Sequence, residues 1–289
     1  MKVILTPISG ETAETSALDC GLDLARRFDG LMRAIHVREN ARDALALHPG
    51  LLKSLSQKAR QEVAKTAESE AEKAAQKAEQ LFSRFCDGQG VVITRRPRRI
   101  DKPTATWEVK GGDPHHVISI VGRLADLIVI ARPGHKLDED TGRFIKAALF
   151  ETGSPLLLVP RRRQATLGTR ITIAWDCSIA AKRAVFAALP LLAQAEAVRI
   201  VSLGSLPRLG PVARDLAEYL NFHGIRSDLV VQRAPRPTPD EALLAAIRDF
   251  DSDLVVMGAY TRSRLRQRIF GGFTRTMLNE SGLPVLFHN

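Results

Sequence analysis

The chain has 289 residues and a formal net charge of +10, from 42 basic and 32 acidic side chains. Hydrophobic residues make up 45% and charged residues 26%, ordinary values for a globular protein that exclude wholesale disorder. The three cysteines fit no zinc or disulfide pattern, and no apolar run approaches the roughly 18–20 residues of a membrane helix. We therefore expect a cytoplasmic protein with two domains.

The first elements along the chain indicate an α/β fold. Apolar runs at 3–5, 127–130 and 156–159 predict short strands that are buried on both faces. Residues 51–85 are rich in Ala, Glu, Lys and Gln, with apolar side chains at helical spacing, which predicts one long amphipathic helix. Such a helix covers a sheet or binds a partner, and an ordinary sheet-covering helix is the simpler interpretation.

The second half shows the same signals. Apolar runs predict strands at 171–174, 198–203, 229–231, 254–257 and 285–287. Helical patterns lie between them at 180–193, 211–223 and 239–250. Strands that alternate with helices predict parallel, doubly wound sheets. Ligands of such sheets bind at the carboxyl ends of the strands, where the strand order reverses.

An internal repeat organises these elements. Residues 151–159 match 280–287, residues 125–130 match 252–257, and the opening strand at 3–9 has a counterpart at 171–178. Each copy reads strand, helix, strand, helix, then strand, helix, strand. The repeat predicts two tandem domains, 1–160 and 169–289, joined by a linker that begins with three arginines.

A glycine-rich loop in the second copy predicts an anion site. Gly258 ends a predicted strand, and Gly271 and Gly272 precede a helix, so the backbone there can approach a ligand closely. Backbone N–H groups at the start of that helix and the hydroxyl of Thr274 would face a phosphate. Four arginines add positive charge to the same loop: Arg262, Arg264, Arg266 and Arg268. The alternative is a loop whose glycines only turn the chain.

A single acid accompanies this loop. Asp176 follows the first strand of the second copy, so it belongs to the same edge of the sheet. Its carboxylate could accept a ribose hydroxyl, hold a metal ion beside phosphates, or cap the following helix.

These residues resemble the universal stress protein family in its tandem two-domain form. The family's nucleotide-binding members carry the motif G-x2-G-x9-G-[S/T] and an acid after the first strand. Gly258 matches the first glycine, Gly271 the last, and Asp176 the acid. Thr261 stands at the second glycine and Gly272 at the Ser/Thr position, with Thr274 supplying a hydroxyl two residues later.

The resemblance implies two Rossmann-like domains of the adenine nucleotide alpha hydrolase-like type. These would pair through their last strands as an intrachain pseudo-dimer. It also implies bound ATP or another adenine nucleotide, with Mg²⁺ possible through Asp176. The implied binding residues are Asp176 at the ribose, Ser202 and Leu203 near the adenine, and Met257, Gly258, Thr261, Gly271, Gly272, Phe273 and Thr274 around the glycine loop.

The first copy departs further from the motif. Ala131 replaces the first glycine, the loop is shorter, and Arg143 and Ile145 stand where a small residue and Thr would be. No acid occurs in the segment from Pro7 to Ser9. We expect this copy to have lost the nucleotide and to serve as a packing partner.

The leading hypothesis is a stress-response sensor or regulator, with an unknown protein partner and a possible homodimer. We expect no membrane contact and no nucleic acid, because no basic strand carries aromatic side chains. The alternatives are a slow ATPase and a non-nucleotide-binding interaction module. Weaker candidates are His115-His116, which lacks a third metal ligand, Cys177, interpreted as a small buried residue, and Ser178, which has no hydrolase motif.

Overall fold

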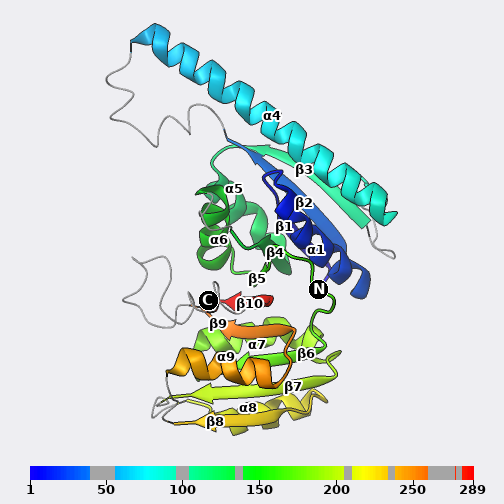
Figure 1. The fold of residues 1–289 in the computed structure, drawn as a ribbon, viewed down its shortest axis with the longest axis vertical. Helices are drawn as coiled ribbons and strands as arrows, with labels where there is room; N and C mark the ends of the chain where they lie inside the picture. The colour runs from blue at the N-terminus through cyan, green and yellow to red at the C-terminus, as the bar shows by residue number, and fades with distance from the viewer. Residues whose placement is uncertain are drawn as a thin grey trace. The chain divides into compact units, whose positions relative to one another are not determined.

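The structure is a computed structural model that describes residues 1–39, 56–95, 104–133, 139–204, 210–233, 238–259, 277 and 282–289. Five of the predicted site residues lie outside this part of the chain: Thr261, Gly271, Gly272, Phe273 and Thr274. The chain forms two compact units, Met1–Thr152 and Gly153–Asn289 (Figure 1). The predicted domain limits, 1–160 and 169–289, stay a prediction.

The first unit is a parallel sheet covered by helices. Its strands have the order β3-β2-β1-β4, and the registers of β1 with β2, β1 with β4, and β2 with β3 are all parallel. Helix α1 packs beside α4, and α5 packs beside α6. The elements are β1 (Val3–Pro7), η1 (Thr12–Glu14), α1 (Thr15–Arg27), β2 (Leu31–Arg38), α4 (Gln57–Gln89), β3 (Thr104–Gly111), α5 (Pro114–Val121), η2 (Gly122–Leu124), β4 (Leu127–Ala131) and α6 (Glu139–Glu151).

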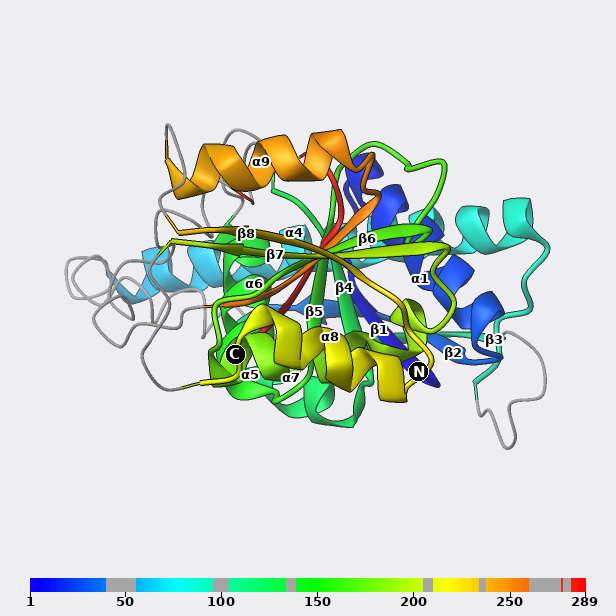
Figure 2. The same cartoon turned by 90° about the horizontal axis from the view of Figure 1, so that it is seen from below.

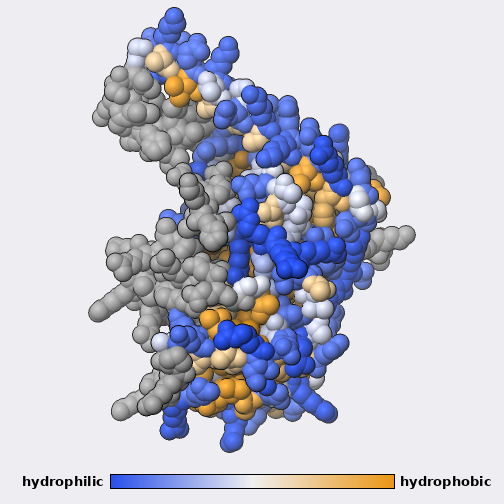
Figure 3. Space-filling view, viewed as in Figure 1, coloured by the Kyte–Doolittle hydropathy of each residue, from blue (hydrophilic) through white to orange (hydrophobic). Residues whose placement is uncertain are grey.

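Helix α4 confirms a long amphipathic helix, although it starts six residues after the predicted start at residue 51. It starts after the cap Ser56, whose side chain accepts from the backbone N of Ala59, and it ends at Gly90 with φ 63°. The helix runs four residues past the predicted end because buried Cys86 continues its apolar stripe. Its buried side chains all come from the second half, where Phe82 stacks on Trp107 of β3 at 5.3 Å between ring centroids. That half covers the sheet, as expected, and the visible face of α4 is mainly hydrophilic (Figure 3).

The second unit has the same architecture with two more strands. Its strand order is β5-β10-β9-β6-β7-β8, and β5 pairs antiparallel with β10 whereas the other neighbours are parallel. Helix α9 lies on one side of the sheet and α7 and α8 lie on the other (Figure 2). The elements are β5 (Leu156–Val159), β6 (Arg170–Ala174), α7 (Ile179–Leu192), β7 (Ala197–Leu203), α8 (Ala213–Phe222), β8 (Asp228–Gln232), α9 (Pro239–Asp249), β9 (Leu254–Gly258) and β10 (Val285–His288).

The repeat contains more elements than the sequence suggested. Each copy has five strands, β1–β5 and β6–β10, so the predicted four-strand order is wrong. The apolar runs predicted all five strands of the second copy, but in the first copy they predicted only β1, β4 and β5 and missed β2 and β3. The reason is that β2 and β3 do not read as continuous apolar runs. In β2, Arg33 and His36 interrupt the apolar residues, and the guanidinium of Arg33 pairs with Glu108 of β3 through contacts of 2.9 and 3.0 Å. Two polar side chains that satisfy each other across strands hide both strands from a hydropathy pattern.

Candidate functional site

The strand order of the second unit defines where a ligand would bind. Strand β6 lies between β9 and β7, with Ala174 in register with Met257 on one side and with Val201 on the other. The chain leaves β6 toward β7 and later returns to β9 on the opposite side, so the order reverses between β6 and β9. Ligands of doubly wound sheets bind outside the carboxyl ends of the strands at such a point. Asp176 follows the end of β6, and Ser202 and Gly258 lie at the carboxyl ends of β7 and β9.

Asp176 is held in a short turn that leads into α7. The backbone N of Ser178 donates to Asp176 Oδ1 at 3.1 Å, and Cys177 between them has a positive φ of 64°. The cap of α7 is Ser178, whose Oγ accepts from the backbone N of Ala181 at 3.0 Å, so Asp176 is not the helix cap. The Asp176 side chain is exposed. An exposed carboxylate therefore stands beside the positive end of a helix dipole.

Ser202 is buried under this turn. Its hydroxyl donates to the backbone O of Trp175 at 2.8 Å, and its exposed fraction is 1%. The Trp175 backbone N donates to Val201 O at 2.8 Å, and the indole N–H donates to Pro211 O at 2.9 Å. These contacts fix the turn that presents Asp176. The placement of Ser202 and half-buried Leu203 near a base stays a prediction.

Gly258 has a structural reason to be glycine. A Cβ at this position would lie 2.5 Å from the backbone N of Ala181 and 2.8 Å from the backbone C of Ala180. The first turn of α7 thus packs directly on the end of β9, where no side chain fits. The neighbouring Met257 is buried in the core. Glycine at the first motif position therefore allows α7 to pack closely at the site, because the backbone of α7 occupies the space beside its Cα.

Cys177 is not activated as a nucleophile. Burial raises the pKa of its thiol, and the negative charges of Asp176 and Asp215 raise it further. A Cβ at Gly210, where φ is 149°, would lie 3.2 Å from the Cys177 Cβ, so the loop before α8 packs against this residue. The neutral thiol is a packing group, partly buried behind the turn.

Register identifies the corresponding positions of the first unit. Ile4 pairs with Leu127 in the first unit as Ile171 pairs with Leu254 in the second. Counting along the strands places Ser9 at the position of Asp176. The same count places Ala131 at the position of Gly258, in agreement with the sequence.

A carboxylate is nevertheless present in the first unit. The backbone N–H groups of Ser9, Gly10 and Glu11 all donate to the carboxylate of Glu14 at 2.9 Å, and the Ser9 hydroxyl donates at 3.0 Å. Burial raises the pKa of Glu14, and these hydrogen bonds act in the opposite direction. The first unit therefore has an acid at this turn, but it points inward onto its own backbone.

The counterpart of Ser202 is His36. The backbone N of Ile8 donates to Ile35 O, as Trp175 donates to Val201 O in the second unit. Nδ1 of buried His36 lies 3.0 Å from the backbone O of Ile8, the carbonyl equivalent to that of Trp175. A carbonyl only accepts, so Nδ1 carries the proton. Burial lowers the pKa of this imidazole.

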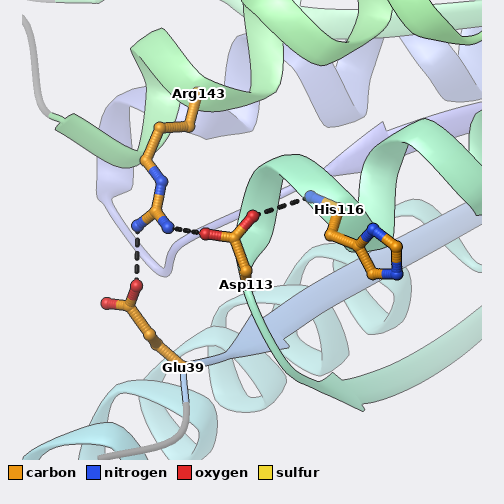
Figure 4. Close-up of polar contacts among 4 residues, drawn as sticks. All are labelled: Glu39, Asp113, His116 and Arg143. Atoms are coloured by element: carbon orange, nitrogen blue, oxygen red, sulfur yellow. Dashed lines mark hydrogen bonds and ion pairs between the residues drawn. The ribbon is translucent and has the colours of Figure 1, made fainter. Parts of the chain in front are cut away.

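A cluster of charged side chains also lies at the corresponding edge of the first unit's sheet. The guanidinium of Arg143 in α6 lies between two carboxylates (Figure 4). Its Nη1 donates to Glu39 Oε1 at 2.7 Å, and its Nη2 contacts Asp113 Oδ2. Asp113 Oδ1 also accepts from the backbone N of His116 at 2.8 Å and thereby caps α5. Arg143 occupies the motif position that Gly272 holds in the second copy.

The sequence pattern does not predict these side-chain contacts of the first unit. The sequence motif marks Arg143 only as a departure from the family pattern, and it assigns no role to Glu14, His36, Glu39 or Asp113. The available signal for Glu14 was an acid in the first turn before α1, five residues after Ser9. Its inward direction depends on loop geometry, which the pattern does not contain.

Within the residues that the structure describes, no group of three or more His, Cys, Asp or Glu side chains is arranged to hold a metal ion. His115 instead lies 3.1 Å from Glu151, measured between Nε2 and Oε1. None of the described helices combines the length and the apolar character needed to cross a bilayer.

Comparisons with known proteins agree with this architecture. The model of the universal stress protein family matches residues 1–145 and 169–287. A search of curated proteins found no match. Among solved structures, a universal stress protein from Archaeoglobus fulgidus DSM 4304 has a TM-score of 0.64 at 18% identity, covering 99% of this chain and 97% of that one.

Two further structures come from Pseudomonas aeruginosa. A functionally unknown protein of strain PAO1 has a TM-score of 0.58 at 14% identity, and a putative universal stress protein of strain UCBPP-PA14 has 0.57 at 13%. Each covers 99% of this chain and 91% of its own, so these likenesses show the fold. With the family model matching both repeats, the chain belongs to the universal stress protein family, in a tandem form.

Proposed function

We propose that the second unit binds an adenine nucleotide, ATP in the first place, and that the protein acts as a stress-response sensor or regulator. The observation that carries the proposal is the exposed carboxylate of Asp176 at the reversal point between β6 and β9. It stands beside the N-terminus of α7, on a turn fixed by Ser202 and Trp175. A carboxylate in this place can accept the hydroxyls of a ribose.

The remaining contacts follow from the family motif. Ser202, Leu203 and Met257 would lie toward the base, and Gly258 would carry the chain into the loop. Thr261, Gly271, Gly272, Phe273 and Thr274 would face the phosphates, through backbone N–H groups and the Thr274 hydroxyl. Mg²⁺ bound with the nucleotide would neutralise phosphate charge, and Asp176 is the residue that could help to hold it.

One nucleotide per chain is the expected stoichiometry. In the first unit the position of Asp176 is Ser9, which is engaged by Glu14, and the motif position of Gly272 is Arg143, which is paired with Glu39 and Asp113. A nucleotide there would have to displace two internal sets of charged hydrogen bonds. A titration with ATP should therefore give one site, and two equivalent sites would contradict this assignment.

A thermal shift with the Asp176→Ala variant tests the proposal. MgATP at roughly 100 times its dissociation constant should stabilise the protein by about 2.7 kcal/mol, which a melting curve resolves easily. Asp176→Ala should lose most of this shift, whereas Asp23→Ala, which removes an exposed acid of α1, should keep it. An absent shift in ligand-free parent protein at millimolar MgATP would refute nucleotide binding.

The alternatives separate in the same samples. Release of ADP at a steady rate that Asp176→Ala abolishes would favour the slow ATPase. Mass spectrometry of small molecules released on denaturing the purified protein tests for retained nucleotide. Neither retained nucleotide nor a thermal shift is the result expected of an interaction module that binds no nucleotide.

A further inference from the structure

Strand β7 continues past the end of its pairing with β6. The ladder between the two strands ends at Ala174 with Val201, whereas β7 runs on to Leu203 and stays paired with β8. One more backbone bond joins the two chains beyond that point, from Trp175 N to Val201 O at 2.8 Å. The next bond of a parallel ladder would run from Leu203 N to Trp175 O. Among the described residues that bond is absent, so the ladder stops one step short.

A side chain satisfies the Trp175 carbonyl in place of the backbone. The Ser202 hydroxyl donates to Trp175 O at 2.8 Å, and Ser202 is only 1% exposed. A buried carbonyl needs a donor, and a ladder normally supplies it from the backbone of the neighbouring strand. Because the hydroxyl fills this role, the Leu203 N–H is left out of the ladder.

The backbone groups of Leu203 face the β6 side of β7. Val201 O accepts from Trp175 N, whereas Gly204 N donates to Gln232 O at 2.8 Å, so residue 201 faces β6 and residue 204 faces β8. Backbone groups alternate in direction along a strand. The N–H and C=O of Leu203 therefore face the space beyond the last residue of β6, and no described residue bonds to this N–H. That space is the carboxyl edge of the sheet, where ligands of doubly wound sheets bind.

The first unit has the same arrangement with a different side chain. The ladder of β1 with β2 ends at Pro7 with Ile35, although β2 continues. Ile8 N donates to Ile35 O, and the next carbonyl, Ile8 O, accepts from His36 Nδ1 at 3.0 Å and not from Val37 N. A hydroxyl and an imidazole N–H thus end the ladder at equivalent positions. The shared feature is a side-chain donor that takes the carbonyl and leaves the following backbone N–H unused.

We propose that Ser202 is a positioning residue of the nucleotide site, because its hydroxyl occupies the Trp175 carbonyl and keeps the Leu203 N–H available as a donor to the base. This inference rests on the proposed function. Ser202 does not touch the ligand itself, since its hydroxyl is buried and already engaged. In Ser202→Ala the carbonyl loses its donor, and the next donor in ladder order is the Leu203 N–H. The ladder would then gain one bond and withdraw this N–H from the ligand.

Amide hydrogen exchange of the ligand-free protein, resolved by NMR, tests the backbone part. In the parent the Leu203 amide should exchange faster than the Gly204 amide, which is bonded to β8. Ser202→Ala should slow the exchange of Leu203 at least about tenfold, and Ser202→Thr, which keeps a hydroxyl, should leave it fast. A Leu203 amide that is as protected as Gly204 in the parent, or that Ser202→Ala does not slow, would overturn the proposal.

Calorimetric titration tests the consequence for the ligand. Ser202→Ala should weaken MgATP and adenosine by the same factor, about tenfold, because both contain the base, and inorganic triphosphate should bind as in the parent. Ser202→Thr should restore the affinity for both. Ser252→Ala is the matched control, since it removes another buried hydroxyl of this unit, bonded to Thr172 at 2.7 Å, and it should bind like the parent.

The two possible failures give different results. A parent that binds neither MgATP nor adenosine would refute the proposed function and this inference with it. A parent that binds both ligands no more tightly than Ser202→Ala does would refute the role of Ser202 and leave nucleotide binding intact. A loss in Ser202→Ala that Ser252→Ala reproduces would show a general effect of lost stability and would also overturn the inference.

Discussion

After β1 the first unit directs a carboxylate inward onto three backbone N–H groups, whereas after β6 the second unit leaves a carboxylate exposed. The two turns follow equivalent strands that pair with their neighbours in the same register. In each turn a side chain contacts the equivalent backbone carbonyl, His36 in the first unit and Ser202 in the second. The two turns differ in the sequence position of the acidic residue. An acid at the turn itself faces solvent, and an acid five residues later folds back and closes the turn. The same fold therefore leaves the carboxylate exposed at this sheet edge in one unit and engaged by backbone N–H groups in the other.

The largest expected effect concerns the packing of α7 on β9. Gly258→Ala would place a Cβ 2.5 Å from the Ala181 backbone, so backbone must shift, and we expect a loss of about 2–3 kcal/mol in the free energy of unfolding. The reverse change in the first unit, Ala131→Gly, should cost only about 1 kcal/mol, mainly through added chain freedom. Urea unfolding of both variants measures the difference. Equal losses would show that the two units pack their helices alike.

Removal of Glu14 should cost more than removal of Asp176. Glu14→Ala leaves the N–H groups of Ser9, Gly10 and Glu11 without their acceptor, and we expect a loss of about 2 kcal/mol. Asp176→Ala removes one backbone hydrogen bond at an exposed site and should cost about 0.5 kcal/mol. Chemical denaturation of ligand-free protein provides both values. The reverse ranking would contradict the inward and outward assignment of the two acids.

The Arg143 cluster should show coupling between its members. Arg143→Met leaves Glu39 and Asp113 close together without a cation, and we expect a loss of about 1–2 kcal/mol at low salt, since these side chains are partly exposed. Glu39→Gln should be less damaging in the Arg143→Met background than in the parent. A double-mutant cycle in urea measures this interaction. Strictly additive losses would mean that the three side chains do not act as a unit.

The smallest expected effect depends on pH. Burial lowers the pKa of His36 in the folded state, so between that lowered value and 6.5 the unfolded chain binds more protons than the folded one. Stability should therefore rise with pH across this window and level off above 6.5. His36→Ser, which copies Ser202 of the second unit, should flatten this part of the profile. An unchanged slope in melting temperature between pH 5 and 7 would exclude His36 as its source.

Hydropathy predicted the strands that are apolar throughout. Leu254, Val255 and Val256 are fully buried in β9, and a run of that kind has few other interpretations. Hydropathy did not predict strand β2, because Arg33 is accommodated there only through its pairing with Glu108, and the two residues lie 75 positions apart in the chain. Long-range pairing of polar side chains is not encoded in local pattern. For this reason the hydropathy pattern missed β2 and β3 in the first copy.

The candidate site divides in the same way. The sheet rule alone places Asp176 at the reversal point, and the registers of β6 with β7 and β9 confirm that location on the fold. The role of Gly258 could not be anticipated, because the motif suggests a ligand where the structure has helix backbone. The direction of Glu14 likewise depends on loop dihedral angles that no spacing reveals. The glycine loop from Thr261 to Thr274 stays a prediction.

Strand β5 lies at the end of the first copy in the sequence but belongs to the second compact unit in the structure. In that unit Leu157 pairs with Leu286 of β10. The boundary between compact units therefore does not coincide with the boundary between copies. Deleting the first copy as a coding segment would remove the outer neighbour of β10 and uncover an apolar strand. The last strand of the second copy therefore depends for its pairing on a strand that the second copy does not encode.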